Sequence, residues 1–336
     1  MSLPANYCRV AIVGASSLRG KDLAATLEER GFPATDVRLL DDEVVDGTLA
    51  EAGGEPIVIQ GIDEESFDGV RFAFFAGAPD LTGRHWQQAA RSGSTVIDMG
   101  GPLALEPSAT SWIPALRRVL PPEKTSNGRL FYSPPPSAII AVSLAVALRE
   151  FEPRCITLTV FQPVSERGQD GIEELESQTV GLLSMKPIAA GIFDAQIAFN
   201  MLSNYGESSR LRLQEGGAAA ARDVRNYLAG RLPAPAMQFV QAPVFYGNTF
   251  SAFVESERVR ERGEIERALE AAGLKVATST SDSPNNVSIA GESVVRFAPV
   301  EHDANVAGGF WLWGAADNLR LASANAISIA ETLLAS

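Results

Sequence analysis

The first 130 residues alternate between short apolar runs and segments with helical spacing. Residues 9–13 form a compact apolar run, and Leu23, Ala24 and Leu27 follow it as one face of a helix would. Further apolar strands are predicted at 37–40, 56–60, 70–76 and 95–98, and a further helix at 81–92. Strands that alternate with helices favour an α/β fold with a parallel, doubly wound sheet.

The pattern changes after Pro153. Alternating apolar and polar positions predict strands at 156–161, 237–240 and 249–254, and helical spacing predicts helices at 171–183, 218–228 and 317–334. This mixture favours a second, α+β domain with a mixed or antiparallel sheet.

Three successive prolines, Pro134 to Pro136, stand between the two halves. They predict a turn or linker, because a proline ring is excluded from helix interiors and central strands. Ser137 then follows as the predicted N-cap of a helix over 138–150.

Composition and charge narrow the classes of function. The chain has 336 residues, 46% of them hydrophobic, and a net charge of −13, which opposes binding to nucleic acid or anionic membranes. No apolar run is long enough to span a membrane. The two cysteines, Cys8 and Cys155, lie far apart in apolar contexts, so we expect reduced core residues and a cytoplasmic protein. No Cys/His spacing supports a metal site.

A glycine-bearing turn links the first strand to the first helix. Gly14, Ser17 and Gly20 mark it, and backbone N–H groups at such a helix start can hold a pyrophosphate, so Ser16 and Leu18 are candidate contacts too. Asp41, at the end of the next strand, has the usual spacing of a carboxylate that binds ribose hydroxyls. The alternative is a structural turn without a ligand, since Ser17 has a Cβ where the backbone should approach a phosphate.

Several segments resemble the aspartate-semialdehyde dehydrogenase family, in the family's order and spacing. They are 14–20, 65–70, 95–98, 161–162, 171–176, 178–179, 196–200, 243–245, 312–313 and 316–320. The resemblance implies a homodimer that reduces aspartyl phosphate to the semialdehyde with NADPH, through a thioester on a cysteine. It also implies a dinucleotide-binding, Rossmann-like domain at 1–132, completed by a C-terminal helix at 317–336, and a substrate and dimerisation domain at 133–316.

The chain departs from the family where the reaction takes place. The resemblance aligns Pro136 with the nucleophilic cysteine, Asn248 with the histidine base, and Gln241 with the arginine that binds the substrate carboxylate. Proline has no nucleophilic atom, and an amide does not accept a proton near neutral pH. Gln162 is the substrate-handling group that remains. We therefore expect a usg-like paralogue that is inactive in the family reaction.

The cofactor positions are retained in part. Gly77 and Gly168 match points of close backbone approach, and Asn318 matches a residue near the nicotinamide. The family often has Arg-Ser after the second strand for the 2′-phosphate of NADP, but here valines follow the acidic run 41–43. We therefore expect NAD rather than NADP if a dinucleotide binds, the alternative being a solvated strand end.

Two other functions stay open. The chain could be an NAD(P)-dependent oxidoreductase of aspartate-pathway metabolism that acts on an acyl-phosphate or semialdehyde type of substrate. It could also be a regulatory or scaffolding partner of a true family enzyme.

Overall fold

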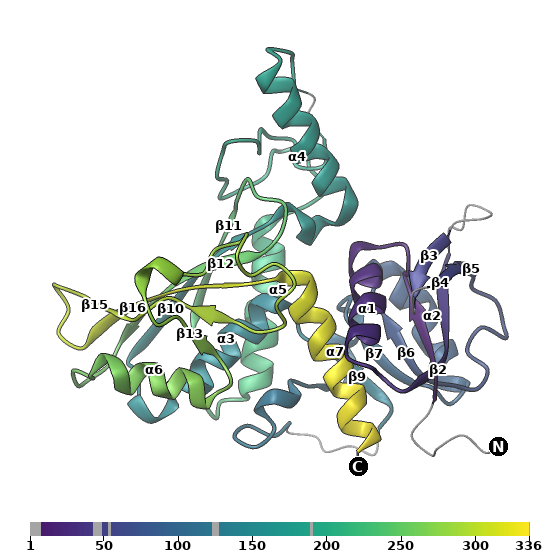
Figure 1. The fold of residues 1–336 in the computed structure, drawn as a ribbon, viewed down its shortest axis with the longest axis horizontal. Coiled ribbons are helices and arrows are strands. Elements are labelled where there is room, and N and C mark those ends of the chain that lie inside the picture. The colour runs from purple at the N-terminus through teal and green to yellow at the C-terminus, as the bar shows by residue number, and fades with distance from the viewer. Residues whose placement is uncertain (1–7, 43–48, 53–54, 123–127, 189–190, 336) are drawn as a thin grey trace. The chain divides into compact units, whose positions relative to one another are not determined.

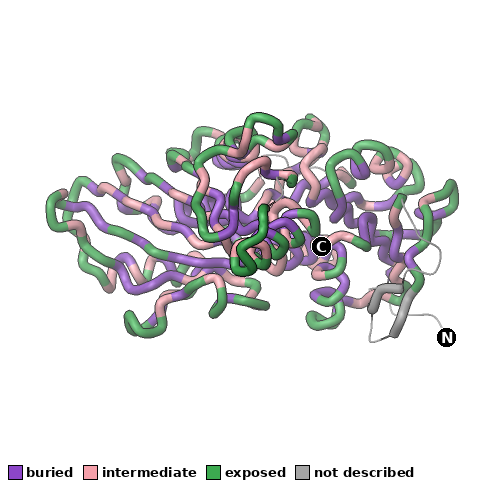
Figure 2. Tube along the Cα trace, turned by 90° about the horizontal axis from the view of Figure 1, so that it is seen from above, coloured by how far each residue is buried: buried purple, intermediate pink, exposed green. Residues whose placement is uncertain are grey.

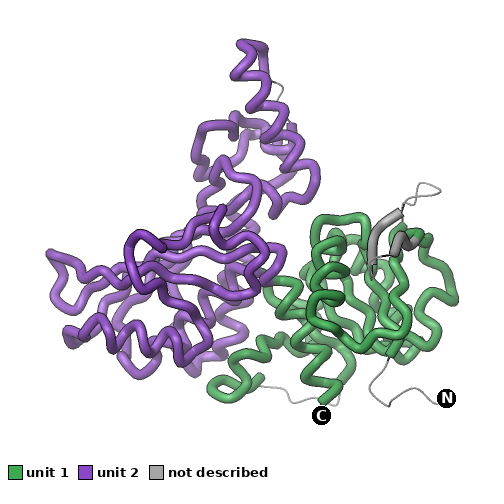
Figure 3. The backbone as a smooth tube through the Cα atoms, in the orientation of Figure 1, with its two compact units in different colours: residues 1–135, 322–336 green, residues 136–321 purple. Residues whose placement is uncertain are grey.

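The chain folds into two compact units, each built around its own seven-stranded sheet. The computed structural model describes residues 8–42, 49–52, 55–122, 128–188 and 191–335 (Figure 1). The first unit consists of residues 1–135 and 322–336, and the second of residues 136–321 (Figure 3).

The first unit confirms the predicted parallel α/β sheet. Its strands are β1 (Cys8–Val13), β2 (Ala34–Asp41), β5 (Gln60–Gly61), β6 (Val70–Phe75), β7 (Thr95–Asp98), β8 (Thr110–Ser111) and β9 (Leu130–Tyr132). They pair in parallel in the order β5-β2-β1-β6-β7-β9-β8. Helix α1 (Leu18–Glu29) follows β1, and α2 (Pro79–Arg91) follows β6.

Both faces of this sheet are buried. Val10 and Ile12 of β1 belong to one hydrophobic cluster, while the alternate residues Ala11 and Val13 belong to another. Coverage on both faces explains why the strands read as continuous apolar runs.

Helix α7 (Asn318–Leu334) begins in the second unit and continues into the first. Its apolar residues Ala322, Ala326, Ile327, Ile329 and Ala330 join the same cluster as Val10 and Ile12. The end of the chain therefore completes the core of the N-terminal unit.

The predicted strand at 56–60 is divided in the structure. Its first part lies in β4 (Glu55–Val58), which pairs antiparallel with β3 (Leu49–Ala52), and its last residue lies in β5. The apolar run did not reveal this division, because pairing depends on a partner strand elsewhere in the chain.

The second unit has a mixed sheet, as predicted. Its strands are β10 (Cys155–Gln162), β11 (Ala236–Gln241), β12 (Asn248–Glu255), β13 (Lys275–Val276), β14 (Arg296–Phe297), β15 (Glu301–His302) and β16 (Gly309–Ala316). Their order is β11-β10-β12-β16-β14-β13, with β15 beside β16. The helices are α3 (Pro136–Ala147), α4 (Gly168–Leu183), α5 (Leu213–Leu228) and α6 (Arg262–Ala271).

Helices cover one face of this sheet. Helix α3 is buried along its whole length and packs against α5, α6 and β10. Side chains therefore alternate in burial along β10 and β12 (Figure 2). The opposite, half-exposed face carries Phe161, Phe253, Trp311 and Trp313, which we call the outer aromatic face.

Three local predictions are wrong. Pro136 is not in a linker but is the first residue of α3, where its fixed φ and missing N–H are tolerated. Ser137 accordingly lies inside the first turn and is not the N-cap. Cys155 is exposed at the start of β10 rather than buried, whereas Cys8 is buried.

Candidate functional site

The glycine turn of the first unit joins β1 to α1. Gly14 has a φ of +82°, and a Cβ there would lie 2.4 Å from the Cα of Gly77, so this position needs glycine. A Cβ on Gly77 would lie 2.6 Å from Leu81 Cδ2 and 3.1 Å from the Cα of Gly14. Gly20 is equally crowded, since an added Cβ would lie 2.2 Å from the Gly14 carbonyl oxygen. Leu18 is the first residue of α1. The turn thus packs the N-terminus of α1 against the backbone at Gly14, which in turn contacts the backbone at Gly77.

Ser17 is the N-cap of α1. Its Oγ accepts a hydrogen bond from the Gly20 N–H at 2.9 Å and donates one to the Ala76 carbonyl at 3.1 Å. A serine at this position is therefore explained by capping, a signal that the glycine spacing alone did not reveal.

Asp41 bonds directly to the turn. Its Oδ2 accepts from the Ser16 N–H at 3.2 Å and from the Ser16 hydroxyl at 2.5 Å, and its Oδ1 accepts from the Asp42 N–H at 3.0 Å. A carboxylate has about four lone-pair sites, so capacity for a ribose hydroxyl remains.

The neighbouring carboxylate, Asp42, is held by two residues of α2. Its Oδ2 accepts from Arg84 Nε at 2.8 Å and also from Arg84 Nη2, and its Oδ1 lies 2.6 Å from His85 Nε2. Burial raises the pKa of Asp42, but the bonds from Arg84 and His85 outweigh it and hold the pKa below its usual range. Sequence reasoning missed this cluster, because the four strands β3 to β6 lie between Asp42 and α2 in the chain.

A buried carboxylate shapes the loop after β7. Asp98 accepts hydrogen bonds from the N–H groups of Gly100 at 2.7 Å and Leu103 at 2.8 Å, and its burial raises its pKa. Arg19 of α1 donates to the carbonyls of Met99 and Gly77. Arg19 therefore links the loop after β6 to the loop after β7 through these hydrogen bonds, rather than extending into solvent.

In the second unit, three amide side chains share one end of the sheet. Gln162 ends β10 and pairs in register with Gln241, which ends β11. Phe161 pairs with Thr249, so the next position of that register sets Gln162 opposite Asn248. All three are buried on the face that the helices cover. The sheet therefore brings together Gln162, Gln241 and Asn248, as the resemblance implies.

The polar atoms of Gln241 are already used within the chain. Its Nε2 donates to the carbonyls of Gln162 and Ala242, and its Oε1 accepts from the Tyr205 hydroxyl at 2.8 Å. The Arg167 Nε in turn donates to Tyr205 at 3.3 Å. Burial raises the pKa of Tyr205, which keeps this phenol protonated as a donor.

Asn248 is fully buried and contacts an acid. Its Nδ2 donates to Glu166 Oε1 at 3.3 Å, while its Oδ1 has no hydrogen-bond partner among the residues that the structure describes. A free buried amide oxygen can accept a hydrogen bond from a ligand or a water molecule.

Asn318, at the start of α7, ties two loops together. Its Oδ1 accepts from the Gly247 N–H at 2.9 Å, and its Nδ2 donates to Ser165 Oγ at 3.1 Å. Gly168, with a φ of +71°, begins α4 just after Ser165. Both residues belong to the second unit, and the glycine turn belongs to the first.

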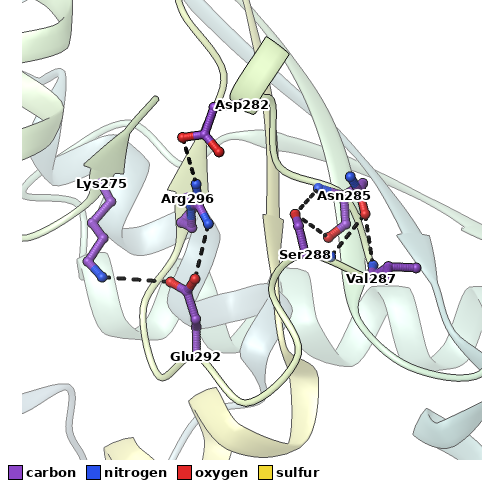
Figure 4. A network of polar contacts seen from close by, with 7 residues as sticks. All are labelled: Lys275, Asp282, Asn285, Val287, Ser288, Glu292 and Arg296. Atoms are coloured by element: carbon purple, nitrogen blue, oxygen red, sulfur yellow. Dashed lines mark hydrogen bonds and ion pairs between the residues drawn. The ribbon is translucent and has the colours of Figure 1, made fainter. Parts of the chain in front are cut away.

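A polar loop, residues 282–292, lies against Gly247. A Cβ on Gly247 would lie 2.9 Å from Ile289 Cδ1. Arg296 holds this loop with bonds to Glu292 at 3.0 Å and Asp282 at 3.1 Å, and Asn285 accepts from the N–H groups of Val287 and Ser288 (Figure 4). The loop therefore fixes the turn that presents Asn248.

Neither the thiol nor the imidazole of this unit reaches the amide cluster. Cys155 and Gln162 are the two ends of β10. His302 pairs with Phe310 near the start of β16, whereas Asn248 pairs with Ala316 at its end. The described residues of the cluster therefore offer amides, a phenol and Glu166, but no thiolate or imidazole.

Two features are absent from the described part of the chain. No group of three or more His, Cys, Asp or Glu side chains gathers there in a way that could hold a metal ion. None of its helices combines the length and apolarity needed to cross a bilayer.

Comparison with known proteins gives consistent matches over both units. The family model described as "Semialdehyde dehydrogenase, NAD binding domain" matches residues 9–120, and the one described as "Semialdehyde dehydrogenase, dimerisation domain" matches residues 144–321. The first unit is thus of the family's nucleotide-binding type.

Individual proteins match over almost the whole chain. A USG-1 protein homolog of Azotobacter vinelandii is 31% identical, with 97% of each chain covered. Aspartate-semialdehyde dehydrogenase 2 of Vibrio cholerae is 27% identical, again with 97% of each covered. The crystal structure of aspartate semialdehyde dehydrogenase II from Vibrio cholerae superposes with a TM-score of 0.87 at 26% identity, covering 98% of both chains. The chain therefore belongs to the aspartate-semialdehyde dehydrogenase family.

Proposed function

We propose that this chain is a member of the family that binds a dinucleotide but does not perform the thioester reaction. The observation that carries the proposal is Pro136. It is buried as the first residue of α3, at the position that the resemblance aligns with the nucleophilic cysteine. An acyl transfer needs a thiolate or another activated nucleophile there, and a proline ring supplies none.

The other aligned positions support the same proposal. Asn248 stands in place of the histidine base, and its amide bonds to Glu166 rather than to a nucleophile. Gln241 stands in place of the carboxylate-binding arginine, and Tyr205 and two backbone carbonyls already use its polar atoms. A charged acyl phosphate would therefore meet two amides and the Glu166 carboxylate at these positions, in place of a histidine and an arginine.

The dinucleotide part rests on the turn of the first unit. Gly14, Ser16, Ser17, Leu18 and Gly20 would hold the pyrophosphate at the N-terminus of α1. Asp41 would hold the ribose, which favours NAD over NADP. Gly77, Gly168 and Asn318 are further proposed contacts. When bound, the nicotinamide supplies hydride chemistry.

Activity and binding measurements test this proposal together. With aspartate semialdehyde, phosphate and either NAD or NADP, we expect turnover about 10⁴-fold or more below an active family enzyme, because loss of a nucleophile has effects of that size. Aspartate-semialdehyde dehydrogenase 2 of Vibrio cholerae is the matched control. Intact-mass spectrometry should detect no acyl adduct, and calorimetry should detect NAD binding.

Each part of the proposal can fail separately. Turnover or a covalent adduct would favour the alternative of an active aspartate-pathway oxidoreductase. Inactivity without binding of NAD or NADP would instead favour a regulatory or scaffolding partner of a true family enzyme.

We also propose a cytoplasmic homodimer that associates through the outer aromatic face. Trp311 and Trp313 are 43% and 39% exposed on it. Their indole N–H groups already donate to Asp303 Oδ2 and the Pro284 carbonyl, so the rings offer apolar surface with no unpaired donor. A second copy of the chain could bury this surface.

A further inference from the structure

We infer that Asp42 acts against the binding of NADP, because its carboxylate occupies the Arg84 guanidinium and the His85 imidazole, which would otherwise receive a 2′-phosphate. The inference rests on the proposed binding of a dinucleotide. It concerns the residue after β2 and two residues of α2, which the sequence does not bring together.

The cluster of Asp42, Arg84 and His85 lies where the ribose 2′-position of a dinucleotide is recognised. In doubly wound sheets, the carboxyl end of the second strand lies beside the adenosine ribose, where an acid binds the 2′-hydroxyl or an arginine accepts a 2′-phosphate. Asp41 is the last residue of β2, and its carboxylate is bonded to Ser16 of the turn. Asp42 follows directly, so its partners Arg84 and His85 lie at the place where the phosphate of NADP would come.

The geometry of the contact is that of anion recognition. Arg84 approaches one oxygen of Asp42 with both Nε and Nη2, and His85 Nε2 lies 2.6 Å from the other oxygen. A guanidinium binds carboxylates and phosphates through the same planar fork. The side chain of Arg84 is 56% exposed, and those of Asp42 and His85 are 25% and 18% exposed, so this fork is open to solvent on one side.

The charges of Asp42 and Arg84 then explain why NAD would be preferred over NADP. With Asp42 in place, the positive charge of Arg84 is compensated inside the protein, and a phosphate dianion would have to displace a bonded carboxylate. Without the carboxylate, Arg84 would carry an uncompensated charge beside the ribose. The acidic strand end therefore excludes NADP by occupying the Arg84 guanidinium that could bind its 2′-phosphate.

The test compares affinities for paired ligands. Calorimetry with NAD and NADP, and with ADP and 2′,5′-ADP as minimal probes, gives the preference for a 2′-phosphate. For Asp42→Asn we expect this preference to rise about tenfold or more, since one charge-assisted bidentate contact becomes available. The double variant Asp42→Asn/Arg84→Ala should return to the wild-type preference.

Asp68→Asn is the matched control. It removes the same charge from an exposed residue just before β6, at the amino ends of the parallel strands, whereas Asp42 lies at their carboxyl ends. We expect its preference to equal that of the wild type. If Asp42→Asn binds NAD but keeps the wild-type preference, or if the wild type prefers NADP, the inference is overturned. If no form binds any of the four ligands, the proposed dinucleotide function itself fails.

Discussion

Single side chains in the second unit decide which groups a ligand would meet. The donors and the acceptor of the Gln241 amide are already used, whereas Asn248 keeps a buried oxygen without a partner among the described residues. The two amides therefore have opposite consequences. Gln241 offers a ligand no free polar atom, and Asn248 leaves a single acceptor for a neutral donor such as a hydroxyl or an amide N–H.

The two cysteines also differ in their surroundings, since Cys8 is buried and Cys155 is exposed. Burial raises the pKa of Cys8, and Arg71 opposes this shift only in part. Because the thiolate is the reactive form, a raised pKa keeps Cys8 unreactive at a pH where an ordinary thiol, with a pKa of about 8.5, is largely ionised. In Cys155→Ser, which retains only Cys8, we therefore expect no reaction with DTNB at pH 7 or pH 9.

The same variant unfolded in urea is the control and should react with one equivalent. Rapid reaction of the folded variant at pH 7 would contradict the burial of Cys8.

At the scale of elements, the parts that follow from local patterns were predictable. The strand predicted at 95–98 coincides with β7, because its apolar run is short and bounded by turns. The glycine turn was also found, since its chemistry lies within seven consecutive residues. The start of α3 was missed, because the proline rule excludes helix interiors but permits the first turn.

Contacts between distant elements were not predictable in this way. The bond between His85 and Asp42 joins residues 43 positions apart, and its formation depends on how β2 and α2 are arranged in the unit. The hydrogen bond from Tyr205 to Gln241 likewise depends on tertiary packing. Spacing along one sequence carries no signal for such pairs.

The loop behind Gly247 gives a test at this scale. Arg296 is 17% exposed in its side chain and bonds to both Glu292 and Asp282. Removing it leaves the partly buried Glu292 without its shorter ion pair. For Arg296→Ala we therefore expect the free energy of unfolding to fall by about 1–3 kcal/mol, measured by urea denaturation.

Lys275→Ala is the matched control for this loop. Lys275 is 63% exposed and lies 3.7 Å from Glu292, so its removal should change the free energy of unfolding by less than about 0.5 kcal/mol. Equal losses in the two variants would show that Arg296 does not hold the loop.

At the scale of the whole molecule, the outer aromatic face accounts for the proposed assembly. Register pairs Thr159 with Ser251, and Ser251 with Trp313, so Thr159 lies on this face in one row with Trp313. An arginine there would introduce a charge into an interface that excludes water. We expect wild-type protein to be a dimer and Thr159→Arg to be a monomer, as measured by light scattering after size-exclusion chromatography.

Thr278→Arg supplies the control, since Thr278 is exposed and lies outside the strands of the sheet. It should remain dimeric. A dimeric Thr159→Arg variant would assign the interface to another surface.

The path of α7 has a consequence for synthesis. Helix α7 supplies part of the hydrophobic core around β1, although β1 is made long before α7 during translation. The apolar side chains of β1 therefore stay uncovered until α7 has left the ribosome. A nonsense mutation or proteolytic cut within α7 would consequently expose β1 to chaperones and proteases, while every strand of the second unit's sheet would still be present in the chain.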